Sequence, residues 1–252
     1  MTIYSHIQNA VNTKRKLLAV LIDPDKFQLE NTKQFILKVN ASIATHIFVG
    51  GSTVQQNATH ALVIEIKKYT QLPIVLFPGD VTQITGRADA LLFLSLISGR
   101  NPDYLIDKHV KAVQTLKGLN LEVIPTGYIL IDGGQITAVE RVTKTKPMVV
   151  SGLQDIANTA KAGQLLGMKL IYLEAGSGAK QAVSFETIKQ VKQDVNIPLI
   201  VGGGIKSKIQ INEAFTAGAD MVVIGTAFEK DETFFEAINE VGERKKINTS
   251  IA

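Results

Sequence analysis

Short apolar runs recur along the chain, and each is followed by Gly, Ser, Asp or Pro and then by a segment with helical spacing. None of the runs alternates apolar with polar residues, so the strands that they predict are buried on both faces, as in a parallel sheet. Eight strands are expected. They are Leu17–Ile22, His46–Val49, Ile74–Phe77, Ala90–Leu94, Leu121–Ile124 (with a longer alternative that ends at Leu130), Lys169–Glu174, Pro198–Val201 and Met221–Ile224.

The segments between the strands carry apolar residues at helical spacing. Residues 153–160 place Leu, Ile and two Ala side chains on one stripe of a helix. Ser184 and Ser207 stand where the N-caps of two further helices would lie, and Pro102 stands where the first turn of another would begin. The chain therefore alternates strands with helices.

Eight strands alternating with helices predict a single (β/α)₈ (TIM) barrel domain over residues 1–252. Only 12 residues separate Phe77 from Ala90, and Pro78, Gly79 and Gly86 are among them. A helix with two loops does not fit in that space, so we predict that the third helix is missing or reduced to a turn. A doubly wound open sheet is the alternative, but Asp-Pro-Asp-Lys rather than a Gly-x-Gly-x-x-Gly turn follows the first strand.

Composition and charge exclude several classes of function. The 27 Lys and Arg against 23 Asp and Glu leave a net charge of +4, which suits an anionic ligand but is too weak and too scattered for nucleic acid. The absence of cysteine excludes disulfides, thiolate nucleophiles and cysteine metal sites. The first 16 residues do not have the pattern of a secretory signal, and no apolar run approaches the length of a membrane span, so a cytoplasmic location is expected.

Two glycine-rich turns follow the last two predicted strands. They are Gly202-Gly203-Gly204 and Gly225-Thr226. Ligands bind at the carboxyl ends of the strands in a barrel, and phosphate is commonly held by backbone N–H groups at these two positions. The alternative is that the glycines only make tight turns. We favour a phosphate site.

Three polar side chains at other strand ends are candidates for the chemistry. Asp23 is either a Mg²⁺ ligand or the cap of a turn before Pro24, and Ser52 is either a second oxygen ligand or a helix N-cap. Glu174 ends an otherwise apolar strand, where a carboxylate is costly unless it is used or paired. It is therefore a candidate general base, with a structural pairing to Lys or backbone N–H groups as the alternative.

The strand-end motifs, taken in order, resemble those of the geranylgeranylglyceryl phosphate synthase family. They are Leu21-Ile22-Asp23-Pro24-Asp25-Lys26, Phe48-Val49-Gly50-Gly51-Ser52, Leu76-Phe77-Pro78-Gly79, Asn101-Pro102-Asp103-Tyr104, Tyr172-Leu173-Glu174-Ala175-Gly176-Ser177-Gly178, Gly202-Gly203-Gly204-Ile205 and Val223-Ile224-Gly225-Thr226. The resemblance runs from about Leu17 to Phe228. Leu21 stands where a bacterial branch of that family has Lys, which favours the branch typified by archaeal enzymes.

The resemblance implies a TIM-barrel prenyltransferase without a standard third helix. It would join the 3-hydroxyl of sn-glycerol 1-phosphate to a long prenyl diphosphate, with geranylgeranyl diphosphate the expected donor, and would release diphosphate with the help of Mg²⁺. Asp23 and Ser52 would hold the metal, and Glu174 would lie near the attacking hydroxyl. The residues implied to bind glycerol phosphate are Tyr172, Leu173, Glu174, Ala175, Gly176, Ser177, Gly178, Gly203, Gly204, Gly225 and Thr226. Thr226 departs from the Asn that is common in the family at this position, although a hydroxyl and a backbone N–H are still present.

Several expectations follow for the rest of the site. Lys26 and Arg100 are candidates to add positive charge near the diphosphate, because both follow strand ends. A shortened third unit would open an apolar groove for the prenyl tail, and residues near it are Phe77, Pro78, Leu94, Tyr104, Tyr128 and Ile129, each of which could instead be ordinary core. Self-association into a homo-oligomer is also expected.

Two other functions compete with this interpretation. A sugar-phosphate isomerase or lyase on the same fold would share the glycine turns but would need neither Mg²⁺ at Asp23 nor a long groove. A non-catalytic relative would only bind anions or serve as a structural subunit. The presence of Asp23, Ser52 and Glu174 together argues against the second of these.

Overall fold

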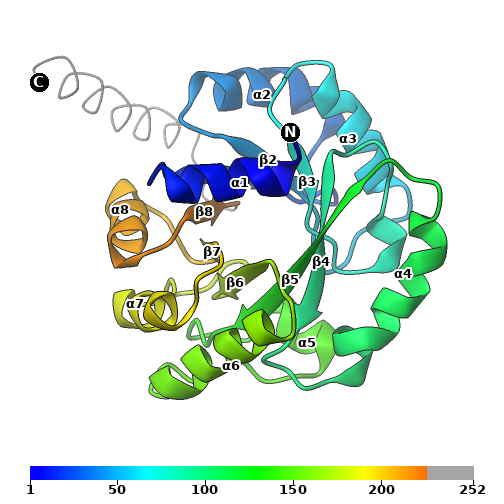
Figure 1. The fold of residues 1–252 in the computed structure, drawn as a ribbon. Coiled ribbons are helices and arrows are strands. Elements are labelled where there is room, and N and C mark those ends of the chain that lie inside the picture. The colour runs from blue at the N-terminus through cyan, green and yellow to red at the C-terminus, as the bar shows by residue number, and fades with distance from the viewer. Residues whose placement is uncertain (226–252) are drawn as a thin grey trace, which may run out of the picture.

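All eight predicted strands form, and they close into one parallel barrel with the strands in sequence order (Figure 1). The structure is a computed structural model that describes residues 1–225. β8 pairs with β1 to complete the circle, so the open doubly wound sheet is ruled out. The strands are β1 (Leu17–Ile22), β2 (His46–Val49), β3 (Ile74–Leu76), β4 (Ala90–Leu96), β5 (Glu122–Leu130), β6 (Leu170–Glu174), β7 (Leu199–Gly202) and β8 (Met221–Ile224).

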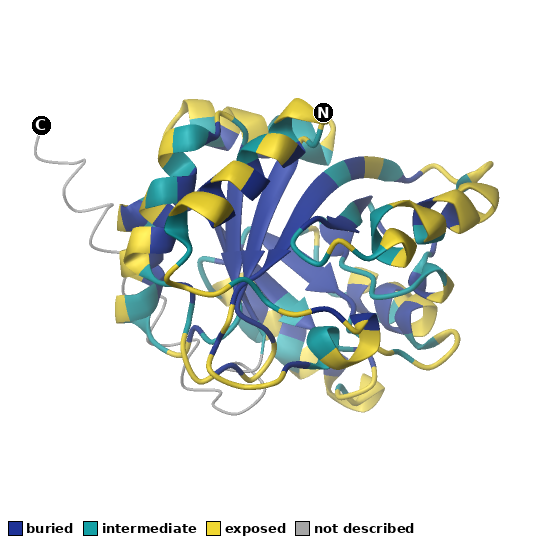
Figure 2. Cartoon of the chain, turned by 90° about the horizontal axis from the view of Figure 1, so that it is seen from below, coloured by how far each residue is buried: buried dark blue, intermediate teal, exposed yellow. Residues whose placement is uncertain are grey.

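The helices surround the barrel, and their outward positions carry the exposed residues (Figure 2). Ser184 and Ser207 cap two of them as predicted, each accepting a hydrogen bond from the backbone N–H three residues later. The helices are α1 (Ile3–Asn12), α2 (Thr32–Ala41), α3 (Ala58–Lys67), α4 (Lys108–Leu116), α5 (Ala138–Thr143), α6 (Leu153–Leu165), α7 (Phe185–Asp194) and α8 (Lys208–Ala217), with short turns η1 (Leu29–Asn31), η2 (Val81–Gln83) and η3 (Asp103–Asp107).

The unit after the third strand is reduced to a single turn, as the spacing predicted. Only the 3₁₀ turn η2 lies between β3 and β4. The pairing of these two strands is correspondingly short, with register pairs at Val75↔Ala90 and Leu76↔Leu91 alone, whereas β4 and β5 pair over their whole overlap up to Leu96↔Tyr128. The barrel wall is therefore incomplete beside the second half of β4.

Three details differ from the sequence prediction. The helix expected after Pro102 starts as the π-helical turn η3 and becomes α-helical only at Lys108. The helices α1 and α5 were not predicted. α1 packs its Ile7 and Ala10 on the barrel interior, and its first N–H groups donate to the Glu122 carboxylate at the start of β5. α1 therefore covers the amino-terminal end of the barrel, away from the carboxyl ends of the strands.

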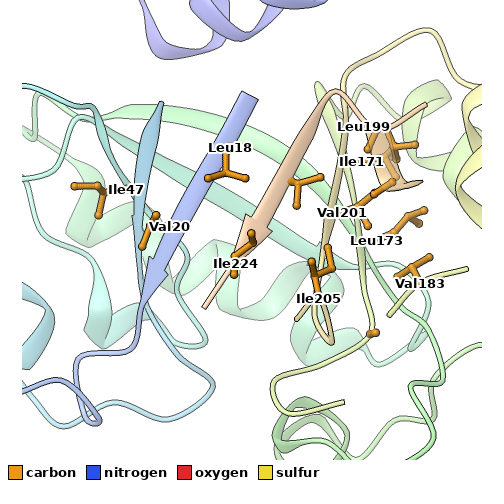
Figure 3. Packing of buried hydrophobic residues seen from close by; sticks show 14 of the residues in the cluster. Leu18, Val20, Ile47, Ile171, Leu173, Val183, Leu199, Val201, Ile205 and Ile224 are labelled. Carbon is orange, nitrogen blue, oxygen red and sulfur yellow. The ribbon is translucent and has the colours of Figure 1, made fainter. Parts of the chain in front are cut away.

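Successive side chains along each strand belong alternately to two hydrophobic clusters. Leu18 and Val20 of β1 point outward into the layer between strands and helices (Figure 3), whereas Leu17 and Ala19 point into the barrel. Both sets are fully buried, which explains why the sequence of each strand shows no alternation of polar and apolar residues. No helix in the described part of the chain is both long enough and apolar enough to span a membrane.

Candidate active site

A large cavity of about 950 Å³ opens at the carboxyl ends of the strands. Most of the site residues predicted from the sequence meet there, although they come from five different strand ends. Those that line the cavity are Asp23, Ser52, Tyr172, Glu174, Ser177, Gly178, Gly203, Gly204 and Gly225. The closure of the barrel thus brings together residues separated by as much as two hundred positions in the chain.

Glu174 is the buried acid of this cavity. Its side chain is only 6% exposed and accepts a hydrogen bond from the backbone N–H of Gly176 at 2.7 Å. Burial raises its pKa to about 7, while the hydrogen bond from the Gly176 N–H and the nearby Tyr172 hydroxyl act in the opposite direction. A carboxyl group with a pKa near neutrality can accept and return a proton under physiological conditions.

The turn after β7 requires glycine not only because the turn is tight but also because a side chain there would collide with Glu174. Gly203 has a φ of +80°, and a Cβ atom built on it would lie 2.2 Å from Oε1 of Glu174. The Gly203 backbone therefore touches the carboxylate directly, at the entrance to α8. From this turn the chain runs through Ile205 and Lys206, which also line the cavity, to Ser207, the N-cap of α8. This arrangement is typical of phosphate sites in barrels.

Asp23 lines the same cavity from the loop after β1. Its carboxylate is 2.5 Å from Nζ of Lys26 and accepts the N–H of Asp25, so it also caps the turn. A Cβ on Gly51 would lie 2.9 Å from Oδ1 of Asp23, so the glycine leaves the carboxylate room. Ser52 lines the same cavity and does not cap a helix, because α3 begins only at Ala58.

Three aromatic rings that line this cavity are in mutual contact. The ring centroid of Phe77 lies 5.1 Å from that of Tyr172 and 5.9 Å from that of Tyr128, and the two tyrosine rings are 5.5 Å apart. Burial, together with the Glu174 carboxylate, raises the pKa of both tyrosines well above the usual value, which keeps their hydroxyls neutral. The rings are thus a neutral aromatic surface next to the acid.

A second, apolar cavity of about 110 Å³ meets the large one at these rings. Phe77, Tyr128, Gly51 and Ser52 line both cavities. The apolar cavity continues along β4 toward α4, through the incomplete wall between β3 and β4. Of the groove residues expected from the sequence, Phe77, Pro78, Leu94, Tyr104 and Tyr128 line it. Ile129 does not, because it packs in the outer core instead.

Some predicted residues do not face the large cavity. Leu173 and Ala175 are buried in the outer core (Figure 3 labels Leu173), and Gly176 contributes only its backbone N–H. Thr226 lies outside the described residues. Lys26 lines the cavity as expected, but Arg100 does not, because its guanidinium group donates to the carbonyl oxygen of Ile97.

The sequence reasoning missed the segment after β5. Gln135 and Arg141 from this segment line the large cavity, as does Lys206 beside the glycine turn. The Gln135 amide donates to the carbonyl oxygen of Gly178 and so joins the segment to the loop after β6. The sequence held a signal for this segment, because Asp132, Gly133 and Gly134 follow the end of β5 as acidic and glycine residues follow the other strands. With the fifth strand taken to end at Ile124, these residues do not follow a predicted strand end, and the signal goes unused. Among residues 1–225, no three His, Cys, Asp or Glu side chains cluster as a metal site.

Comparisons with known proteins agree with this geometry. Residues 10–243 match the PcrB family. The chain is 55% identical over 236 residues to the geranylgeranylglyceryl phosphate synthase of Flavobacterium johnsoniae (94% of this chain, 97% of that protein) and 57% identical over 226 residues to that of Zunongwangia profunda (90% and 96%).

Solved structures give the same result. The crystal structure of (S)-3-O-geranylgeranylglyceryl phosphate synthase from Thermoplasma acidophilum, in complex with its substrate sn-glycerol-1-phosphate, matches with a TM-score of 0.89 at 31% identity and covers 96% of this chain and 98% of that one. An N-acetylmannosamine-6-phosphate 2-epimerase from Clostridium perfringens matches with a TM-score of 0.54 at 15% identity (94% and 93%), which is a likeness of fold alone.

Proposed function

This chain belongs to the PcrB family, and on that premise we propose that it is a prenyltransferase of the geranylgeranylglyceryl phosphate synthase type. It joins the 3-hydroxyl of sn-glycerol 1-phosphate to a long prenyl diphosphate, of which geranylgeranyl diphosphate is the expected one. The C–O bond to diphosphate breaks, an ether bond forms, and the hydroxyl proton leaves. The product is a precursor of ether lipids.

The observation that carries this proposal is the meeting of two unlike cavities at Phe77 and Tyr128. A polar cavity with glycine turns suits a small phosphorylated alcohol, and an apolar one suits a hydrocarbon chain. A sugar-phosphate isomerase or lyase would have no use for the apolar cavity. Because the structural neighbours with such activities share only the fold, they do not favour that alternative.

Glycerol phosphate is expected to bind between the loops after β6 and β7. Backbone N–H groups around Gly178, Gly203 and Gly204 would hold the phosphate, which orients the 3-hydroxyl toward Glu174. Glu174 would then accept the hydroxyl proton as the ether bond forms. A pKa of about 7 leaves about half of the carboxyl groups ionised at neutral pH, which suits a general base.

The aromatic rings would serve the other reactant. As diphosphate leaves, the allylic carbon gains positive charge, and the faces of Phe77, Tyr128 and Tyr172 attract cations. Phe77 and Tyr128 line both cavities, and Tyr172 lies beside them in the large one, where a chain lying in the apolar cavity would place its first carbon. They would also exclude water, which would otherwise hydrolyse the diphosphate.

Mg²⁺ is expected to bind at Asp23 and Ser52. One carboxylate and one hydroxyl that line the same cavity suit an ion that takes few protein ligands and completes its shell with substrate oxygens and water. The space beside the Asp23 carboxylate at Gly51 supports this assignment. When bound, Mg²⁺ would neutralise the charge that develops on the departing diphosphate. Lys26 would add a further positive charge at the same strand end.

The test is a direct assay of the purified protein. It is incubated with sn-glycerol 1-phosphate, Mg²⁺ and prenyl diphosphates of several lengths, and the release of diphosphate and the ether product are measured. Release that requires both substrates would support the transferase. No release with any donor would rule it out, and sn-glycerol 3-phosphate is the control for the choice of acceptor.

Two further expectations rest on measurements outside the active site. We expect a homo-oligomer, and the exposed Leu165 and Leu166 at the end of α6 offer an apolar surface for it. Light scattering of the purified protein measures its mass. We also expect a cytoplasmic location, which fractionation of cells that express the protein would test.

A further inference from the structure

The strands of the closed barrel pair over the shortest stretch between β3 and β4. The two strands pair only as far as Leu76↔Leu91, and β4 then continues to Leu96 without β3 beside it. The gap is bordered by the loop after β3 and η2 on one side and by η3 and α4 on the other. The apolar cavity lies in this gap, so its two edges belong to elements that no strand pairing holds together.

One ion pair joins the two edges. Asp80, in the loop after β3, pairs with Lys108, the first residue of α4, and both line the apolar cavity. Among the described residues that line this cavity, they are the only carboxylate and the only ammonium group, in a lining that otherwise consists mainly of apolar residues. The side chains of Lys108 and Asp80 are 27% and 36% exposed, so the ion pair is partly open to solvent where it spans the gap.

Both partners are held by other contacts. The Asp80 carboxylate accepts the backbone N–H of Thr82 at 3.2 Å and thereby caps η2. Partial burial would raise the pKa of Asp80, but the hydrogen bonds from Lys108 and Thr82 bring it below the usual value, so Asp80 is ionised at neutral pH. Nζ of Lys108 also lies 5.0 Å from the centre of the Tyr104 ring. Both side chains of the ion pair are therefore held in place, and the pair connects the two edges of the gap.

We propose that the Asp80–Lys108 ion pair is a clamp that holds the two edges of this gap together over the prenyl chain, and that it thereby favours long donors over short ones. The inference rests on the proposed function. A short chain fills only the end of the cavity near Phe77, whereas a long chain continues past the bridge. Asp80 and Lys108 are thus positioning residues. Lys108 does not line the large cavity where diphosphate would lie, so a direct contact with the leaving group is not its role.

The test compares the binding of geranyl, farnesyl and geranylgeranyl diphosphates to the wild type, Lys108→Met and Asp80→Asn by calorimetry without glycerol phosphate. Methionine keeps an apolar stem but cannot form the ion pair. We expect the Kd for geranylgeranyl diphosphate to rise about fivefold and the Kd for geranyl diphosphate to change less than about twofold. The double variant should be no weaker than either single one, and KM should change more than kcat.

Lys67→Met is the matched control. Lys67 forms an ion pair with Asp89 at 2.8 Å, also between a helix and the segment before β4, but neither residue lines a cavity. Its loss should leave the dependence of Kd on chain length unchanged. Amide hydrogen exchange gives a readout independent of activity, because residues 81–84 should exchange faster in Lys108→Met than in Lys67→Met.

The outcomes separate the clamp from the proposed function. An equal loss of affinity for all three donors in Lys108→Met would mean that Lys108 contacts the diphosphate, and would overturn the clamp. Unchanged exchange in residues 81–84 would overturn it too. If the wild type binds donors with the expected dependence on length but releases no diphosphate, the clamp stands and the transferase proposal fails.

Discussion

The two sides of this barrel differ in how far their strands pair and in how closely the chain packs around the cavity. Around β6, β7 and β8 the strands pair regularly, and the loops that follow them approach so closely that Gly203 touches the Glu174 carboxylate. Between β3 and β4 the pairing stops early, only the turn η2 connects the two strands, and apolar side chains line the second cavity. The first side can hold a small polar molecule in one orientation. The second can accept a flexible apolar chain.

The difference has a physical reason. Hydrogen bonds to a phosphate and proton transfer from a hydroxyl depend on distances within a few tenths of an ångström, so they require rigid backbone. Hydrophobic burial is non-directional and depends mainly on area, so an apolar groove tolerates a looser wall. Substitutions on the two sides should therefore differ in which substrate they affect and in how steeply.

The largest effect is expected from Glu174→Gln, because the amide keeps the shape of the side chain but cannot accept the proton. Turnover should fall by about 10²–10⁴-fold. The Kd values for glycerol phosphate and for the prenyl donor should change little. Steady-state kinetics and calorimetry measure the two quantities, and turnover close to that of the wild type would reject Glu174 as the base.

Activity should also depend on pH through the same carboxyl group. With a pKa of about 7, kcat/KM should rise with pH and level off above pH 7, and it should be about 100-fold below its plateau two pH units lower. A pH–rate profile measures this dependence, with the product quantified in samples quenched at fixed times. A profile that is flat from pH 5 to 8 would contradict the assignment.

The same titration also affects the stability of the fold. Stability should fall as the pH rises, whereas activity should rise. Because folding raises the pKa of Glu174 from 4.5 to about 7, the folded state binds this proton more tightly than the unfolded state does. The contribution to stability is complete below pH 4.5 and is lost as the pH rises to 7. Glu174→Gln should therefore be more stable than the wild type above pH 7, by about 3 kcal/mol, and the two should converge near pH 4. Denaturant titrations at both pH values test this, and a constant difference would contradict it.

Gly203→Ala should damage the polar side of the site alone. A Cβ there meets Oε1 of Glu174 at 2.2 Å in a backbone conformation with φ +80°, so the turn must move. We expect a loss of about 1–3 kcal/mol in stability and a rise of about tenfold or more in KM for glycerol phosphate. Gly118→Ala is the control, because Gly118 has the same kind of φ (+79°) but nothing within 4 Å of its Cβ. Equal effects on KM in both variants would contradict the role of the Gly203 turn.

The smallest effect is expected on the apolar side. Ala112 is buried on α4 and lines the apolar cavity, so Ala112→Leu should fill part of it. The KM for geranylgeranyl diphosphate should rise about five- to tenfold, with the KM for glycerol phosphate unchanged. Val110→Leu on the exposed side of the same helix is the control. A parallel change in both KM values would mean that the two sides are not separate.

Much of this molecule could be predicted from local pattern. The eight strands were recognisable because strands buried on both faces read as short continuous apolar runs, and the missing third helix followed from counting the residues between Phe77 and Ala90. Asp23, Glu174 and the glycine turns could be placed at one end of the barrel, since parallel strands in this fold bring their carboxyl ends to one face. The π-helical start at η3 carried no comparable signal, whereas α1 did carry one that was not used, because Ile3, Ile7 and Ala10 have helical spacing after Thr2.

What depends on the tertiary structure is distance and environment. The pKa of Glu174 rises to about 7 only because the closed barrel removes the carboxyl group from water, and no local pattern reports that burial. The contacts of Phe77 with Tyr128 and Tyr172, the place of Gln135 and Arg141 at the cavity, and the bridge from Asp80 to Lys108 all join residues far apart in the chain. Side-chain periodicity and turn chemistry act over a few residues, and they therefore specify the strands and their ends. The meeting of a rigid polar site with an open apolar groove is produced by the closure of the barrel and by the early end of one strand pair.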